Sequence, residues 1–239
     1  MIFRNYLRTR NKELGLLKGN EYIVKTIVTT ETIKTIAEQN GFKMYDCYTG
    51  FKWIASVIRE NEGKARYIGG GEESYGFLPE DFVRDKDSVS SISLMAEIAA
   101  WAKDKGMTMY QMLQDIYIKY GYSKEKGISV VRKGKSGAEE IVAMMKNFRE
   151  NPMKDYASLE ATDVVNGTKS KLDMPVTSNV LQYFSADGSK VSIRPSGTEP
   201  KIKFYIEVRG IKMDNYADYD AANAAADAKI EAIKKELGI

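Results

Sequence analysis

Histidine is absent from this sequence of 239 residues, and cysteine occurs only once, as Cys47. Because zinc sites in proteins are built mainly from clustered cysteine and histidine, such sites are excluded here. A single cysteine also excludes an internal disulfide, and chains with so few thiols are typical of reducing compartments. We therefore expect a cytoplasmic protein without a structural zinc ion or disulfide.

A long apolar run and an excess of one charge are also missing. No segment approaches the ~18 apolar residues that a membrane-spanning helix needs, and the opening MIFRNYLRTR lacks the apolar centre of a secretion signal. The 36 lysine and arginine residues nearly balance the 33 aspartate and glutamate residues, which argues against a dedicated nucleic-acid-binding surface. We expect no membrane and no nucleic-acid partner, and we expect any anion site to be local.

The first part of the chain alternates between two patterns. Apolar runs predict strands over 21–30, 42–48 and 65–68. Helical spacing predicts helices over 31–40, 51–61, 89–105 and 108–120, the last of which opens with a capping box. Alternating strands and helices indicate an α/β fold, here a doubly wound, mixed or parallel sheet whose ligands bind beyond the carboxyl ends of the strands. The turn at 49–52 and the loop at 69–76 both follow strands, so we expect them at the same edge.

A different pattern follows. Glycine, lysine and serine accumulate over 120–137, which suits a connection between domains. We place the boundary near residue 131, between a first domain of residues 1–131 and a second of residues 132–239. The second contains a predicted helix over 138–149, candidate strands in NVLQYFS, KVSIR and KIKFYIEV, and an alanine-rich helix over 217–237. This order predicts a smaller α+β domain.

The corner Arg194-Pro195-Ser196-Gly197-Thr198 combines residues that suit a bound phosphate. Proline ends the strand ladder, and glycine allows a left-handed turn that points successive N–H groups into one concavity. Arginine adds a planar charged fork, and the two hydroxyls add donors. The alternative is an ordinary exposed β-turn, for which Pro-Ser-Gly-Thr is a common sequence. The alternating strand KIKFYIEV would hold either arrangement rigidly.

A second candidate is the glycine-rich segment GGGEESYG at residues 69–76. Its adjacent carboxylates, Glu72 and Glu73, together with Ser74, suit the hydroxyls of a sugar or polyol. The segment lacks the third glycine of a dinucleotide fingerprint and the Gly-Lys-Ser/Thr of a P-loop. The alternative is a solvated helix start, because acidic residues are favoured there.

A third candidate is Lys52 in TGFKWI, where a partly buried ammonium would bind phosphate or have a lowered pKa. The alternative is a lysine on the exposed face of an amphipathic helix. The segment VRDKDS is similarly open, since Asp87 or Ser88 can simply cap the next helix.

Four segments together, TGFKWI, GGGEESYGF, RDKD and RPSGTEPKIKFY, resemble the α-D-phosphohexomutase family, and most closely its bacterial phosphoglucomutase and phosphomannomutase members. They occur in the family's order, and the resemblance covers nearly the whole chain. The family interconverts hexose 1-phosphate and hexose 6-phosphate through a bisphosphorylated intermediate, using a phosphoserine and Mg²⁺.

The resemblance implies a role for each matched residue. Glu72 and Ser74 match the loop that binds the sugar hydroxyls in either orientation of the substrate. Lys52 matches a lysine near the reacting centre, which is a candidate general acid or base. The loop that holds the phosphate that is not transferred is matched by Arg194, Ser196, Gly197 and Thr198.

The family's phosphoserine loop and its Asp-x-Asp-x-Asp metal loop have no counterpart in the sequence. The chain therefore resembles the third and fourth domains alone, which the N-terminal catalytic domains of the same protein would complete. Phosphoryl transfer depends on positioning and on charge stabilisation by metal and cationic groups, so we expect hexose phosphate binding without turnover. The Mg²⁺ ligands would lie outside this chain, and we expect no cofactor bound to it.

Two alternatives remain open beside a phosphoglucomutase-type isomerase of carbohydrate metabolism. One is a phosphomannomutase, and the other is a stand-alone phosphosugar-binding module. Gly76 stands where some phosphomannomutase-like members carry a histidine, which favours the phosphoglucomutase.

Overall fold

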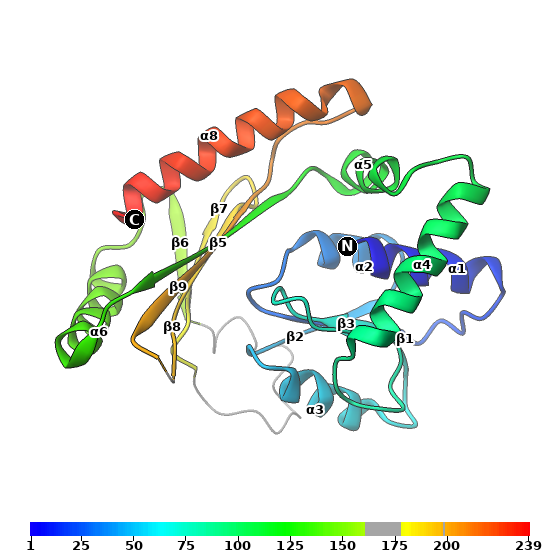
Figure 1. Ribbon diagram of the computed structural model, residues 1–239, viewed down its shortest axis with the longest axis horizontal. Coiled ribbons are helices and arrows are strands. Elements are labelled where there is room, and N and C mark those ends of the chain that lie inside the picture. The colour runs from blue at the N-terminus through cyan, green and yellow to red at the C-terminus, as the bar shows by residue number, and fades with distance from the viewer. Residues whose placement is uncertain (161–177, 198) are drawn as a thin grey trace. The chain divides into compact units, whose positions relative to one another are not determined.

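The structure is a computed structural model, which describes residues 1–160, 178–197 and 199–239. The chain forms two compact units, and the first gives way to the second between Tyr120 and Gly121. Figure 1 shows the helices and strands of each unit.

The first unit is an α/β domain with a mixed sheet. Its helices are α1 (Ile2–Glu13), α2 (Thr32–Gln39), α3 (Phe51–Asn61), α4 (Ser88–Asp104) and α5 (Met109–Tyr120). Its strands are β1 (Glu21–Thr26), β2 (Lys43–Cys47), β3 (Arg66–Gly71) and β4 (Phe77–Leu78). The strand order is β2-β1-β3-β4, with β1, β2 and β3 parallel and β4 antiparallel to β3. The α/β fold with a mixed sheet is confirmed.

The helices of this unit cover both faces of the sheet. Right-handed crossovers from β1 to β2 and then back to β3 place α2 and α3 on opposite faces, as Figure 1 shows. On the α2 side, Ile23 of β1 packs with Ile33 and Ala37. On the α3 side, the Tyr45 hydroxyl donates to Asn61 Oδ1 at 2.8 Å.

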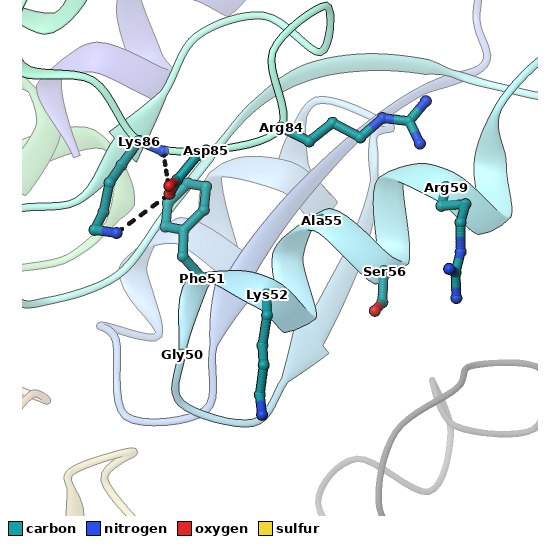
Figure 2. Close-up of a pocket in the computed structure, with 9 residues that line it drawn as sticks. All are labelled: Gly50, Phe51, Lys52, Ala55, Ser56, Arg59, Arg84, Asp85 and Lys86. Atoms are coloured by element: carbon teal, nitrogen blue, oxygen red, sulfur yellow. Dashed lines mark hydrogen bonds and ion pairs between the residues drawn. The ribbon is translucent and has the colours of Figure 1, made fainter.

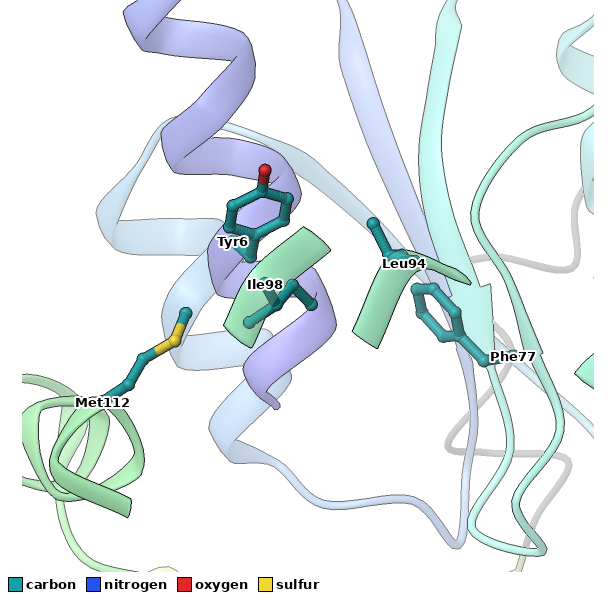
Figure 3. Close-up of a cluster of buried hydrophobic side chains, with 5 residues drawn as sticks. All are labelled: Tyr6, Phe77, Leu94, Ile98 and Met112. Carbon is teal, nitrogen blue, oxygen red and sulfur yellow. The ribbon is translucent and has the colours of Figure 1, made fainter. Parts of the chain in front are cut away.

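The helix α1 was not expected, because few residues of IFRNYLRTRNKE are apolar. Tertiary contacts explain it. Tyr6 of α1 belongs to a buried cluster formed with β4, α4 and α5 (Figure 3). The members of this cluster are Tyr6, Phe77, Leu94, Ile98 and Met112. Tyr6 is buried, and burial of a large apolar side chain contributes about 1.5–3 kcal/mol, which offsets the weak intrinsic pattern of α1.

The carboxyl ends of the three parallel strands meet at one edge, as expected. Thr26 of β1 pairs with Cys47 of β2, and Lys25 pairs with Gly71 of β3. The turn after β2 and the loop after β3 therefore begin side by side. This edge carries the first candidate site.

The second unit is an antiparallel sheet with helices. Its strands are β5 (Lys124–Val131), β6 (Tyr156–Glu160), β7 (Leu181–Ser185), β8 (Lys190–Pro195) and β9 (Lys201–Val208), in the order β5-β9-β8-β7-β6. Its helices are α6 (Gly134–Glu150), α8 (Tyr219–Leu237) and the short η1 (Tyr216–Asp218). Phe148 of α6 packs edge to face against Phe204 of β9, and the apolar residues of β9 are buried. An α+β arrangement is confirmed.

The boundary differs from the expected one near residue 131. The strand β5 lies within residues 120–137, the segment expected to connect the domains, yet it pairs along its whole length with β9. The sequence KEKGISVV mixes charge and glycine because β5 is an edge strand of the sheet. The expected first domain therefore included a strand of the second sheet.

Candidate functional site

Residues 72–76, here called the Glu72 loop, connect β3 to β4 at the carboxyl edge of the first sheet. The Glu72 N–H donates to the Gly76 carbonyl at 2.9 Å, which closes the loop. A Cβ added at Gly71 would lie 2.5 Å from the Gly76 carbonyl oxygen, so glycine there is required by close packing. The loop leads into a strand, so the alternative of a helix start is wrong.

The two adjacent glutamates of this loop lie in different surroundings. The Glu73 carboxylate accepts a hydrogen bond from the Thr26 hydroxyl at 3.1 Å, while the Ser74 hydroxyl donates to its other oxygen at 2.9 Å. Glu72 instead lies beside Gly76, where an added Cβ would be 2.9 Å from Glu72 Oε1. The residue types alone do not distinguish the two carboxylates, and the fold shows what each of them contacts.

A shallow hollow of about 650 Å³ lies beside the start of α3 (Figure 2). Cationic side chains of α3 and of the segment before α4 line it, namely Lys52, Arg59, Arg84 and Lys86. Figure 2 shows Asp85 joined to Lys86, whose ammonium lies 3.2 Å from the carboxylate. Anions would be attracted to such a surface.

Lys52 is exposed on α3, as the alternative of a lysine on the exposed face of a helix predicted. Its Nζ lies 4.7 Å from the centroid of the Trp53 ring. Lys86 was missed as a site residue, although RDKD was among the segments that carried the family resemblance. A Cβ added at Gly76 would lie 2.9 Å from Lys86 Cδ, so Lys86 links the hollow to the Glu72 loop.

The segment before α4 also contains the cap that we considered. Asp87 accepts hydrogen bonds from the N–H groups of Ser90 at 2.7 Å and Val89 at 3.1 Å. These backbone bonds lower the pKa of Asp87. Asp87 therefore caps α4, as the capping alternative predicted.

A buried lysine, Lys25, stabilises the carboxyl edge of the first sheet. The Lys25 ammonium is fully buried and donates to Asp46 at 2.7 Å, Glu31 at 2.9 Å and the Thr29 carbonyl at 3.4 Å. Burial alone would lower the pKa of Lys25, but the charges of Asp46 and Glu31 raise it above its ordinary value. Burial also raises the pKa of the Cys47 thiol, so this cysteine stays protonated and unreactive at neutral pH.

A second buried cation fixes the end of β3. The Arg4 guanidinium of α1 donates to the Val24 carbonyl at 2.7 Å and the Gly71 carbonyl at 3.3 Å. Burial lowers the pKa of Arg4 to about 10, so it keeps its charge at neutral pH. Arg4 thereby links the end of β3, where the Glu72 loop begins, to both α1 and β1.

The second unit contains the other predicted site, residues 194–197, here called the Arg194 corner. Arg194 is the penultimate residue of β8 and pairs with Lys203 of β9, and the Ser196 N–H donates to the Lys201 carbonyl at 2.8 Å. Arg194 and Ser196 are half-buried. Among the described residues, the Arg194 guanidinium forms no hydrogen bond or ion pair.

Gly197 is exposed, and a Cβ added to it would meet no atom within 4 Å. Its φ is not positive, so the left-handed turn that we expected at this glycine is wrong. Thr198, the remaining predicted residue, lies outside the described residues.

Over residues 1–160, 178–197 and 199–239, no three cysteine, aspartate or glutamate residues are grouped so that they could hold a metal ion. Within the same residues, no helix has the length and apolarity needed to cross a membrane.

Known proteins match both units. Residues 1–120 match the family described as "Phosphoglucomutase/phosphomannomutase, alpha/beta/alpha domain III", and residues 144–225 match "Phosphoglucomutase/phosphomannomutase, C-terminal domain". Phosphoglucomutase of Staphylococcus haemolyticus (strain JCSC1435) is 32% identical over 209 residues, which are 83% of this chain and 37% of the relative. Phosphoglucomutase of Staphylococcus aureus (strain MRSA252) is 35% identical over 206 residues, or 82% and 37%.

A solved structure supports the same fold. The open form of parafusin from Paramecium aligns with a TM-score of 0.61 at 19% identity, covering 91% of this chain and 38% of parafusin. The chain thus spans little more than a third of the length of the relatives that it matches.

Proposed function

Because the chain belongs to the phosphoglucomutase/phosphomannomutase family, of which it spans domain III and the C-terminal domain, we propose that it is the substrate-binding part of a phosphohexomutase. The complete protein would interconvert hexose 1-phosphate and hexose 6-phosphate, with glucose as the favoured hexose. This chain would bind the sugar at one loop and the phosphate that is not transferred at the other. As the cysteine-poor composition suggests, it would act in the cytoplasm.

The Arg194 corner carries the proposal. A guanidinium forms strong, paired hydrogen bonds to phosphate oxygens. Arg194 is held by the β8–β9 register, is half-buried, and has no partner in the described part of the chain. Lys203 opposite it adds a second positive charge. Ser196, Gly197 and Thr198 would complete the phosphate site.

The Glu72 loop and the hollow would handle the sugar and the reacting end. Glu72 and Ser74 would hydrogen-bond to hexose hydroxyls, because carboxylate and hydroxyl oxygens are suitable acceptors. Lys52 would act near the reacting centre as a general acid or base. Lys86 adjoins both Glu72 and the hollow, so it would contribute positive charge to the same site.

The phosphoryl group and the metal would come from elsewhere in the complete protein. Mg²⁺ supplies stabilisation of the charge on the transferring phosphoryl group. The described residues provide no carboxylate cluster to hold it, so its ligands would belong to the N-terminal catalytic domains. We expect that the isolated chain binds hexose phosphates and does not convert glucose 1-phosphate to glucose 6-phosphate.

A titration of this chain with glucose 6-phosphate and inorganic phosphate, followed by backbone amide shifts, tests the proposal. Phosphate should shift Gly197, and only the sugar phosphate should also shift Glu72 and Ser74. Charged hydrogen bonds contribute about 1.5–3 kcal/mol, so Arg194→Ala should weaken phosphate binding by about tenfold or more. The control is Lys212→Ala, which removes an exposed charge of the same unit. Unchanged affinity in Arg194→Ala would contradict the proposal.

A further inference from the structure

Glu73 of the Glu72 loop is turned toward the sheet and bonded to the chain itself. Its Oε2 accepts from Thr26 Oγ1 at 3.1 Å and lies 3.5 Å from Thr29 Oγ1. The two threonine hydroxyls are also 2.9 Å from each other. Thr26 ends β1, so these contacts join the loop after β3 to the turn after its neighbouring strand.

The turn that receives Glu73 is itself fixed. Thr26 is fully buried and Thr29 is 7% exposed. The Lys25 ammonium bonds the Thr29 carbonyl, and the same ammonium is paired with Asp46 of β2 and Glu31. A carboxylate bonded to this turn is therefore bonded to a part of the molecule that cannot readily shift.

The Glu72 loop needs these stabilising contacts because its backbone is strained. Tyr75 has a φ of 67°, in the left-handed region that a bulky side chain rarely adopts, and its side chain is fully exposed. The exposed ring does not pack to stabilise that conformation. Residues in unfavourable backbone regions persist when surrounding contacts determine them. The Glu73 contacts and the hydrogen bond between Glu72 and Gly76 are such contacts.

We propose that Glu73 is a positioning residue, which ties the Glu72 loop to the turn after β1 and so presents Glu72 and Ser74 to the substrate. The inference rests on the proposed function of that loop. Glu73 does not contact the sugar in this assignment, so the adjacent glutamates have different roles.

The contact with Glu73 also determines which group receives the hydroxyl hydrogen of Ser74. Its hydroxyl hydrogen points to Glu73 Oε1, so its oxygen faces a ligand as an acceptor. Glu72, when ionised, is likewise an acceptor only. The loop would therefore recognise a sugar that donates hydrogen bonds from two of its hydroxyls, and it would bind poorly to a deoxy or O-methyl sugar phosphate at those positions.

Four variants of the full 239-residue chain test the proposal: Glu73→Ala, Thr26→Val, Thr26→Ser and, as a matched control, Glu80→Ala, which removes an exposed carboxylate after β4. The first readout needs no ligand and is amide hydrogen exchange at Glu72. We expect at least tenfold faster exchange in Glu73→Ala and Thr26→Val. We expect the wild-type rate in Glu80→Ala and in Thr26→Ser, which keeps the hydroxyl.

The second readout is binding of glucose 6-phosphate and of inorganic phosphate. Glu73→Ala and Thr26→Val should weaken glucose 6-phosphate binding by a similar factor and leave inorganic phosphate binding unchanged. Unfolding of the first unit would instead shift urea unfolding followed by tryptophan fluorescence, because both tryptophans lie in that unit.

Two results would overturn the assignment. If Glu73→Ala weakens sugar binding and Thr26→Val does not, Glu73 contacts the sugar directly. If exchange at Glu72 is unchanged in both variants, the loop is not held by Glu73. Should the wild-type chain bind no glucose 6-phosphate, the proposed function fails, and the exchange rates alone decide the role of Glu73.

Discussion

The Glu72 loop and the Arg194 corner are both connections that follow strands, yet they are built in opposite ways. The Glu72 loop is closed: a Cβ added at Gly71 or Gly76 would meet neighbouring atoms at less than 3 Å, and Glu73 accepts a hydrogen bond from Thr26. The Arg194 corner is open: Gly197 meets nothing, and Arg194 has no partner in the described residues. Side-chain contacts shape the first loop, whereas the register of two antiparallel strands shapes the second.

The difference follows from the two sheets. In a parallel sheet, strand ends at one edge are close in space and distant in sequence, so side chains must join them. In an antiparallel pair, backbone hydrogen bonds continue up to the corner, and the side chains there stay available for a ligand. The Glu72 loop should therefore be sensitive to substitutions of residues that contact no ligand. The conformation of the Arg194 corner should instead depend on the pairing of β8 with β9.

The largest loss of stability should come from a substitution in β9, which pairs with β8 at the Arg194 corner. Phe204 is fully buried on β9 and packs against Phe148, so Phe204→Ala should destabilise the second unit by about 3–5 kcal/mol. Urea unfolding followed by circular dichroism measures the loss. Val142→Ala, an exposed site on α6, is the control. Faster amide exchange in the Glu72 loop of Phe204→Ala would contradict the conclusion that separate contacts shape the two loops.

Lys25→Met should have the next largest effect, on the closed loop. It leaves Asp46 and Glu31 without their cation, and losing one partner of a buried pair costs about 3 kcal/mol or more. Because both carboxylate side chains are about one-sixth exposed, at 16% and 17%, we expect the lower figure. Both tryptophans lie in the first unit, so their fluorescence during urea unfolding reports this loss.

The Lys25 network also predicts a pH dependence. The pKa of Lys25 is raised in the folded state, so its stabilisation is complete below the unfolded value of about 10.4 and falls as pH rises above it. The stability difference between wild type and Lys25→Met should therefore shrink at alkaline pH. Exposed Lys34 provides the control, and Lys34→Met should leave the wild-type pH profile intact. A constant difference up to pH 12 would disprove the role of this charge.

Two glycine substitutions compare the loops directly. Gly71→Ala would place a Cβ 2.5 Å from a backbone oxygen and should destabilise the first unit by about 1–3 kcal/mol. Gly197→Ala meets open space without a left-handed φ and should cost within about 0.5 kcal/mol. Thermal unfolding of both variants measures the contrast. Equal losses would show that the open and closed loops do not differ as described.

A smaller effect than that of Gly71→Ala concerns the turn before β8, where Asp187 accepts hydrogen bonds from Lys229, Ser185 and the Ser189 N–H. Burial would raise the pKa of Asp187, but these bonds hold it well below its usual range. Its stabilisation is therefore present above the unfolded pKa of about 3.9 and is lost as pH falls below it. Because the side chain is 41% exposed, Asp187→Asn should cost about 1 kcal/mol or less.

Melting temperatures between pH 7 and pH 3 test this. Wild type should lose more stability than Asp187→Asn over that range. Asp214→Asn, which removes an exposed carboxylate in the same unit, should behave like wild type. Parallel profiles for wild type and Asp187→Asn would contradict the assignment.

Local signals predicted much of the fold. The alternation in KIKFYIEV predicted β9, and Thr108 with Gln111 predicted the start of α5, where the Gln111 N–H donates to the Thr108 hydroxyl at 3.1 Å. Such patterns suffice because the responsible residues are neighbours in the chain. The strand β5 was not predicted because its partner, β9, lies about 70 residues away.

The candidate site, like the fold, could be predicted from the sequence only in part. Sequence by itself determined the family, the two candidate loops and most residues assigned to them, because motifs such as GEESYG and RPSGTEPK are contiguous. Only the tertiary structure decided that Glu73 faces Thr26 while Glu72 lies beside Gly76, that Lys86 joins the hollow, and that Gly197 is not left-handed. The physical reason is that a side chain's role depends on which distant groups the fold brings within hydrogen-bonding distance, and a local pattern carries no record of those groups.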